Sequence, residues 1–123
     1  MAKVVHDDVL DGALQVLVDN AAKMAVCAGQ PADVAACEGG LAIVAMSTGD
    51  FTIGNGSTSG RKVAVAEKAT VAVAATGVAD HVALYSTATN KVYFITTCSS
   101  QALTSTANSV TIPTWAIEIA DPT

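Results

Sequence analysis

Aromatic residues are scarce in this chain: of its 123 residues, 4% are aromatic, with one Trp, two Tyr and two Phe. Hydrophobic residues nevertheless make up 51% of the sequence, so the core has to be built from Ala, Val, Leu and Ile. These side chains bury less apolar area than Phe or Trp, and each fully buried Val or Leu contributes about 1.5–3 kcal/mol. We therefore expect a domain of this length to gain further burial against neighbouring subunits.

Positive charge is also scarce. Six Lys and Arg residues stand against eleven Asp and Glu residues, which gives a formal net charge of -5. The basic residues are scattered, and only Arg61 and Lys62 are adjacent. Nucleic-acid-binding proteins concentrate Lys and Arg to displace the counterions of phosphates. The sequence therefore argues against DNA or RNA as a principal partner.

Long hydrophobic runs are missing as well. No apolar run approaches the roughly 20 residues that span a bilayer as a helix. The N-terminal stretch MAKVVHDDVL lacks the charged head, apolar stretch and cleavage site of a secretory signal. We expect a soluble protein that is made in a cytoplasm and has no membrane partner.

Residues that could carry chemistry are few. Asp80 and His81 are adjacent, but neighbours on a strand point to opposite faces, which argues against a catalytic pair. We expect His81 to lie at a sheet face or at a subunit contact. His6 and the cysteines lack the close CxxC or HxxxH pair that is typical of zinc sites, so no metal site is predicted.

The cysteines are odd in number, so at most one pair of Cys27, Cys37 and Cys98 can form within a chain. The expected state is three small buried thiols, since a free Cys behaves as a small hydrophobe. A disulfide between Cys27 and Cys37, or one between subunits, stays open as an alternative.

No catalytic motif is complete. Ser57, Ser59 and Ser86 lack the GxSxG setting of a hydrolase nucleophile. The stretch GNGSTSG (54–60) lacks the GxxxxGK[ST] pattern of a phosphate loop. Trp115 alternates with apolar residues and is expected to anchor the core, with stacking on a sugar as the alternative. The sequence thus predicts no catalytic, cofactor-binding or metal-binding residue, and no enzyme.

What the sequence does contain is a strong β pattern. Two alternating segments, 81–86 and 92–98, flank a Thr/Asn/Lys turn and predict a hairpin. The segments 61–67 and 70–75 look like paired strands joined by a tight turn at Lys68 and Ala69. Further strands are expected at 23–29, 51–53, 110–112 and 115–120, 41–46 is ambiguous between strand and helix, and 101–109 is polar. About seven short strands predict a mainly β fold, a β-sandwich or barrel.

One α-helix is expected near the N-terminus. Asp7 is a suitable N-cap, acidic residues occupy the first turn, and leucines recur at helical spacing over 7–21. The chain 1–123 then reads as one domain, with an arm (1–6), the helix (7–21) and a sandwich (23–120). The arm and the loops 30–40 and 54–60 are the expected contact segments, because loops carry recognition on a rigid sheet.

Five stretches of the chain together resemble small structural proteins of tailed bacteriophages. They are VHDDVLDGALQVLVDN (5–20), AVCAGQPADVAAC (25–37), GDFTIGNGSTSGRKVAVA (49–66), ADHVALYSTATNKVYFITTC (79–98) and WAIEIADPT (115–123). The likeness covers most of the chain and lies in the arrangement of elements, without a catalytic motif.

The resemblance implies a non-enzymatic virion protein, assembled in the host cytoplasm, with its helix packed on a β-sandwich. Its implied role is that of a capsid decoration (cement) protein that contacts major capsid subunits or other virion proteins. It would act in many copies as a homo-oligomer, with a trimer as the expected state. An acidic protein suits the outside of a capsid better than the inside, which faces DNA.

The alternative implied by the resemblance is a neck, tail or fibre-associated protein. Such a protein would bind a receptor or glycan, and we expect it to present an exposed aromatic platform. The two tyrosines of the predicted hairpin, Tyr85 and Tyr93, are the residues that could form one.

Overall fold

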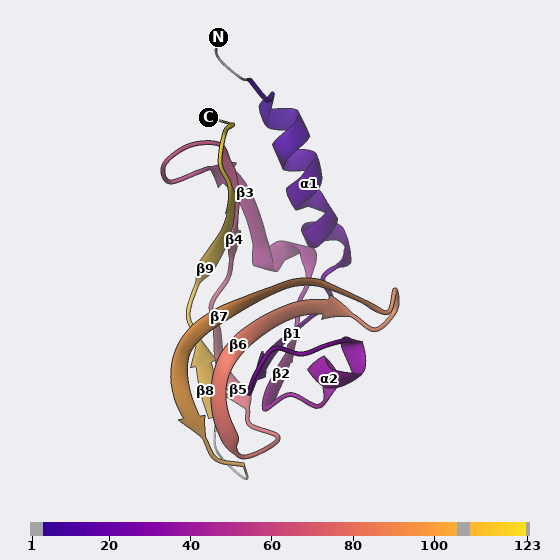
Figure 1. The fold of residues 1–123 in the computed structure, drawn as a ribbon, viewed down its shortest axis with the longest axis vertical. Helices are drawn as coiled ribbons and strands as arrows, with labels where there is room; N and C mark the ends of the chain where they lie inside the picture. The colour runs from indigo at the N-terminus through magenta and orange to yellow at the C-terminus, as the bar shows by residue number, and fades with distance from the viewer. Residues whose placement is uncertain (1–3, 106–108, 123) are drawn as a thin grey trace.

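The computed structural model describes residues 4–105 and 109–122, so part of the expected arm and of the polar stretch 101–109 lies outside the described residues. Strands predominate, as the sequence predicts, and the longest helix lies near the N-terminus (Figure 1). The described elements are α1 (Asp7–Asn20), β1 (Lys23–Cys27), α2 (Val34–Glu38), β2 (Ala42–Ala45), the 3-10 helix η1 (Thr48–Asp50), β3 (Phe51–Asn55), β4 (Arg61–Val65), β5 (Lys68–Ala72), β6 (Gly77–Ser86), β7 (Lys91–Leu103), β8 (Ser109–Ile112) and β9 (Trp115–Ile119).

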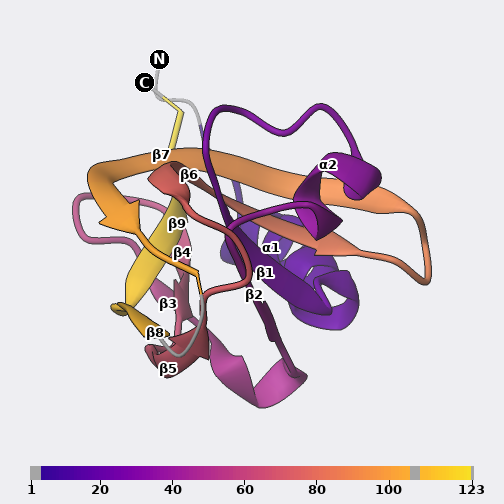
Figure 2. The same cartoon turned by 90° about the horizontal axis from the view of Figure 1, so that it is seen from below.

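The strands form antiparallel sheets that, within the described residues, do not close into a barrel. The strand orders are β2-β1-β6-β7, β3-β4-β9 and β5-β8. Figure 1 shows β3, β4 and β9 extending away from the curved β6–β7 hairpin, with α1 alongside them. Figure 2 shows β7 running alongside β6, with which it pairs.

The predicted pairing of 61–67 with 70–75 is wrong. β4 pairs with β3 and β9, whereas β5 pairs with β8. Asp50 binds the chain directly after the end of β4. Its carbonyl accepts a 2.8 Å hydrogen bond from Ala66 N–H. Its carboxylate also lies 2.9 Å from Lys68 Nζ at the start of β5. These contacts direct β5 towards a different sheet.

Two central strands, β1 and β6, are covered on both faces. Met24 and Leu84 are fully buried in the main core, whereas Ala25 and Tyr85 are fully buried in a second cluster with residues of α2. Successive residues of a strand point to opposite faces. The main core therefore covers one face of this sheet, and α2 covers the other.

The main core is aliphatic, as the composition predicts. Leu14 and Leu17 of α1 pack there with Val63 and Val65 of β4 and with side chains of the other sheets. Phe94 and Trp115 are half-buried at its margin, with ring centroids 6.0 Å apart. Trp115 thus anchors the core edge, and its indole Nε1 has no hydrogen-bond partner within the described part of the chain.

The helix α1 begins as predicted, but with a different cap. His6 is the N-cap, and its Nδ1 accepts a 3.1 Å hydrogen bond from the backbone of Asp8. The prediction of Asp7 as the cap is wrong, because Asp7 already belongs to the helix. Farther along, Asp11 pairs with Arg61 Nε at 2.7 Å. This ion pair ties α1 to β4.

Residues 30–40, predicted as loop, contain the short helix α2. Asp33 is its N-cap and accepts a 2.8 Å hydrogen bond from Ala36 N–H. Val34 and Cys37, three residues apart, are buried on the same side of the helix. The sequence pattern missed α2 because one helical turn carries too few residues for a periodicity to show. The ambiguous segment 41–46 contains the strand β2.

The glycine-rich stretch 54–60 continues β3 and then forms a compact turn. Gly56 N–H donates a 2.9 Å hydrogen bond to Gly60 O, and Thr58 N–H donates one of 3.2 Å to Glu118 on β9. Gly60 has a φ of 69°, a left-handed conformation that favours glycine. This predicted contact loop is thus held to the sheet by its own backbone bonds.

Candidate functional site

The β6–β7 hairpin has an irregular register near its middle. Ala79 pairs with Gln101, but His81 pairs with Thr97, so three residues of β7 lie opposite Asp80 alone. Extra residues on one strand form a bulge, which bends the ladder and re-aims side chains. The predicted hairpin is therefore confirmed, but its strands are longer than expected and the ladder is irregular near its middle.

The bulge brings the side chains of Asp80 and His81 together. His81 Nδ1 lies 2.7 Å from Asp80 Oδ1, so these two side chains meet, although strand alternation predicted that they point to opposite faces. The same carboxylate oxygen accepts a 2.7 Å hydrogen bond from Gly29 N–H. The bonds from His81 and Gly29 lower the pKa of Asp80. The pair therefore ties the β1–α2 connection to β6. His81 itself is largely covered, with 20% of its side chain exposed.

Cys98 lies opposite the same bulge and is exposed, contrary to the prediction of three buried thiols. Although Cys98 is exposed, the neighbouring chain removes part of its hydration, which raises the pKa of its thiol. The negative charge of Asp80 raises this pKa further. An activated thiol nucleophile needs a lowered pKa. The raised pKa therefore disfavours the thiolate form of Cys98.

The other two cysteines, Cys27 and Cys37, are buried free thiols in one cluster with Tyr85. Burial raises the pKa of Cys27 to about 11. A thiol that stays protonated and covered is chemically inert. In the structure the predicted alternative, a disulfide between these two residues, is not formed.

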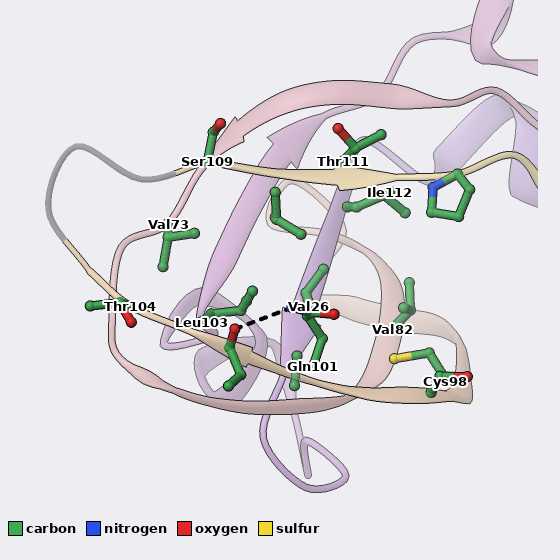
Figure 3. A pocket seen from close by; sticks show the side chains of 15 residues that line it. Val26, Val73, Val82, Cys98, Gln101, Leu103, Thr104, Ser109, Thr111 and Ile112 are labelled. Carbon is green, nitrogen blue, oxygen red and sulfur yellow. Dashed lines mark hydrogen bonds between the residues drawn. The ribbon is translucent and has the colours of Figure 1, made fainter.

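A cavity of about 750 Å³ lies between the C-terminal half of β7 and β8 (Figure 3). Cys98 and Gln101 stand on its β7 side, and Ser109 and Thr111 on its β8 side. We call this cavity the β7–β8 slot. Its lining is Val26, Val73, Ala79, Val82, Cys98, Ser99, Gln101, Ala102, Leu103, Thr104, Ser109, Val110, Thr111, Ile112 and Pro113.

The slot has an aliphatic floor and a polar but uncharged rim. Val26, Val73 and Val82 are each less than a tenth exposed and form part of the floor. Side chains with hydroxyl or amide groups, such as Gln101 and Thr111, stand at the rim. None of the described lining residues is charged, although the protein has a formal net charge of -5.

The tyrosines of the hairpin do not form an exposed pair. Tyr85 is fully buried, and its hydroxyl donates a 2.8 Å hydrogen bond to Glu38. Tyr93 is half-buried, with its hydroxyl 2.7 Å from Thr89 Oγ1. An aromatic platform made of these two residues is therefore not present in the structure.

The remaining chemistry-bearing residues are dispersed. Ser57 and Ser59 belong to the compact turn 54–60, and Ser86 accepts a backbone bond at the β6–β7 turn. Across residues 4–105 and 109–122, no three His, Cys, Asp or Glu side chains gather in a way that could hold a metal ion. In the same residues, no helix has the length and hydropathy needed to cross a membrane.

Comparisons with protein-family models, with curated proteins and with solved structures give no match to this chain. The geometry therefore has to carry the functional argument, and the β7–β8 slot is its most distinctive feature. The sequence did not reveal the slot, because an opening between strands depends on which edges fail to pair. The polar composition of 101–109 was the one local signal of the slot, and the same composition is also typical of a connecting loop.

Proposed function

We propose that this chain is a non-enzymatic structural protein of a tailed-phage particle, of the capsid decoration (cement) type. The phage particle is what the sequence resemblance implies, and the structural observation that supports a contact role is the edge of β7 that pairs with no strand in the described residues, next to the uncharged β7–β8 slot. Free strand edges and concave apolar surfaces are the features by which proteins bind other protein chains. The protein works by contact with neighbouring virion subunits.

A second observation supports assembly into a homo-oligomer. Val9 and Val16 lie two helical turns apart on the outer side of α1, with 65% and 48% of their surface exposed. Small residues, Gly12 and Ala13, lie between them and are also exposed. Contact between copies along this side would supply burial that the Ala-rich core lacks. A trimer around α1 is the proposed state.

The oligomer is tested by sedimentation of the purified protein. The parent is expected to sediment as a trimer, and the double variant Val9→Ser, Val16→Ser as a monomer. The change Gln15→Ser, at another exposed position of α1, serves as the control and should leave the trimer intact. A monomeric parent would remove this part of the proposal.

The particle role is tested by counting copies in purified virions of the phage that encodes the chain. Hundreds of copies for each particle are expected, measured against the major capsid protein by quantitative mass spectrometry. Particles that lack the protein should release DNA at a lower temperature, and added protein should restore the parent value.

Other copy numbers would place the protein elsewhere. Six or twelve copies would assign it to the neck or tail, which is the alternative that the sequence resemblance implies. Absence from purified particles would overturn the virion proposal altogether.

A further inference from the structure

The β7–β8 slot has the form of a missing strand. In the described residues β7 is bonded along β6 and β8 along β5, and no ladder joins β7 to β8. The backbone N–H and C=O groups along such free edges can pair with an additional strand. A strand between them would have a partner on each side.

The floor of the slot fits the alternation of an extended chain. Its buried aliphatic members come from β1, from β6, from the ends of β7 and β8 and from the residue after β5: Val26, Val73, Ala79, Val82, Leu103 and Ile112. Ala102 and Val110 also line the slot and are more exposed. Every second side chain of an inserted strand would point at this floor, and the others would point outward. The volume of about 750 Å³ lies in the range of about 300–1,000 Å³ that proteins use to enclose a ligand.

The uncharged lining of the slot indicates which kind of segment could bind there. Among the described lining residues, the rim offers hydroxyl and amide groups, such as those of Ser99, Gln101 and Ser109, and no charged side chain. A charged group buried there would have no partner, and burying an unpaired charge is costly. Inward positions of the occupant must therefore be uncharged, and small aliphatic side chains suit the floor.

We propose that the β7–β8 slot binds an extended, uncharged segment of a partner protein by β-strand addition, with small aliphatic side chains at alternate positions. The identity of that partner as a neighbouring virion protein rests on the proposed function, but binding of such a segment does not. The slot is then the place where the protein holds its neighbour.

Cys98 provides a direct reporter of slot occupancy. It lines the slot and is exposed, whereas Cys27 and Cys37 are buried. A maleimide reagent should therefore label Cys98 first in the folded protein. A strand bound in the slot should cover this thiol and slow its labelling.

The probe is the acetylated and amidated peptide KTVTVTVTK, whose terminal lysines keep it soluble. At a concentration about ten times its Kd, labelling of Cys98 should slow roughly tenfold, because the free slot then falls to about one tenth. Hydrogen exchange of backbone amides should slow at 98–103 and 109–112. The control peptide KTVTDTVTK, with a carboxylate at the centre, should do neither.

Two variants of the protein distinguish binding in the slot from binding elsewhere on the surface. Thr111→Lys places a charge at the rim and should abolish the effect of the peptide. Thr52→Lys makes the same change at an exposed position of β3, outside the slot, and should preserve it. Both positions are exposed, so both variants are expected to fold.

Three results would overturn the inference. They are equal effects of the two peptides, an unchanged response in Thr111→Lys, or protection of Cys98 by the neutral dye Nile red but not by the peptide. The last result would assign the slot to a small apolar molecule. All these measurements use the purified protein, so their outcome is independent of the particle count that tests the proposed function.

Discussion

At the residue scale, single polar side chains join elements that are far apart in the sequence. Glu38, at the end of α2, accepts 2.8 Å hydrogen bonds from Lys23 on β1 and from Tyr85 on β6. The bond from Lys23 is the main cause of the lowered pKa of Glu38, followed by the bond from Tyr85. One carboxylate thereby fixes α2 over the face of the sheet that holds the second cluster.

Tyr85→Phe should destabilise the protein by about 1 kcal/mol, because it removes a hydrogen bond of a buried hydroxyl and keeps the ring. Urea unfolding of the purified variant measures the loss. Tyr93→Phe is the matched control at an exposed bond to Thr89, and its effect should be smaller. Equal losses in both variants would contradict a specific role for the bond to Glu38.

Gly60→Ala should destabilise the protein by more than about 1 kcal/mol, because φ is positive there. An added Cβ would also collide with the carbonyl of Ile119. Gly54→Ala, where a Cβ meets nothing within 4 Å, is the control. Thermal unfolding should show a lower Tm for the first variant than for the second. The reverse order would contradict the compact turn described here.

At the element scale, α1 is attached to the sheets through one side only. Leu14 is 1% exposed and Leu17 is 8% exposed in the main core, while Val9 on the other side is 65% exposed. The ion pair between Asp11 and Arg61 also fixes the position of α1 along β4. The helix thus contributes to the core through one side and leaves Val9 and Val16 exposed on the other.

Leu14→Ala should cost about 2–5 kcal/mol, because it leaves a cavity between α1 and the sheets. Val9→Ala should change the free energy of unfolding of the monomer by no more than about 0.5 kcal/mol, since its side chain is exposed. Unfolding is measured at a protein concentration at which the chain is monomeric. A small loss in Leu14→Ala would contradict the described packing of α1.

At the scale of the whole molecule, carboxylates make the fold sensitive to acid. Hydrogen bonds and ion pairs lower the pKa values of Glu38, Asp50, Asp80 and Glu118 in the folded state. A lowered pKa adds stability above the pKa of the unfolded chain. That stability is lost as the pH falls through the lower folded value.

We therefore expect the urea midpoint of unfolding to fall from about pH 5 downward, as the pH passes through the ordinary pKa range of Asp and Glu and then through the lower pKa values of the folded state. Glu118→Gln should weaken this dependence, because its backbone bond from Thr58 is the main cause of the lowered pKa. Glu67→Gln, at an exposed carboxylate, should show the same fall as the parent. A midpoint independent of pH between 7 and 3 would contradict the prediction.

Local patterns in the sequence were enough to predict the mainly β class, the long N-terminal helix and the aliphatic core. These follow from local alternation, from the spacing of Leu10, Leu14 and Leu17, and from composition, all of which are readable without contacts. The hairpin 81–86 and 92–98 was likewise found, although its strands are longer than predicted.

The pairing of the strands, and the edges that stay open, could be learned from the folded chain alone. The separation of β4 from β5 depends on contacts of Asp50 that lie 16 to 18 residues apart in sequence. The Asp80–His81 pair depends on a register shift against β7. The β7–β8 slot depends on two edges that fail to meet. Pairing across long sequence separations reflects the packing of the whole chain, so no local pattern records it.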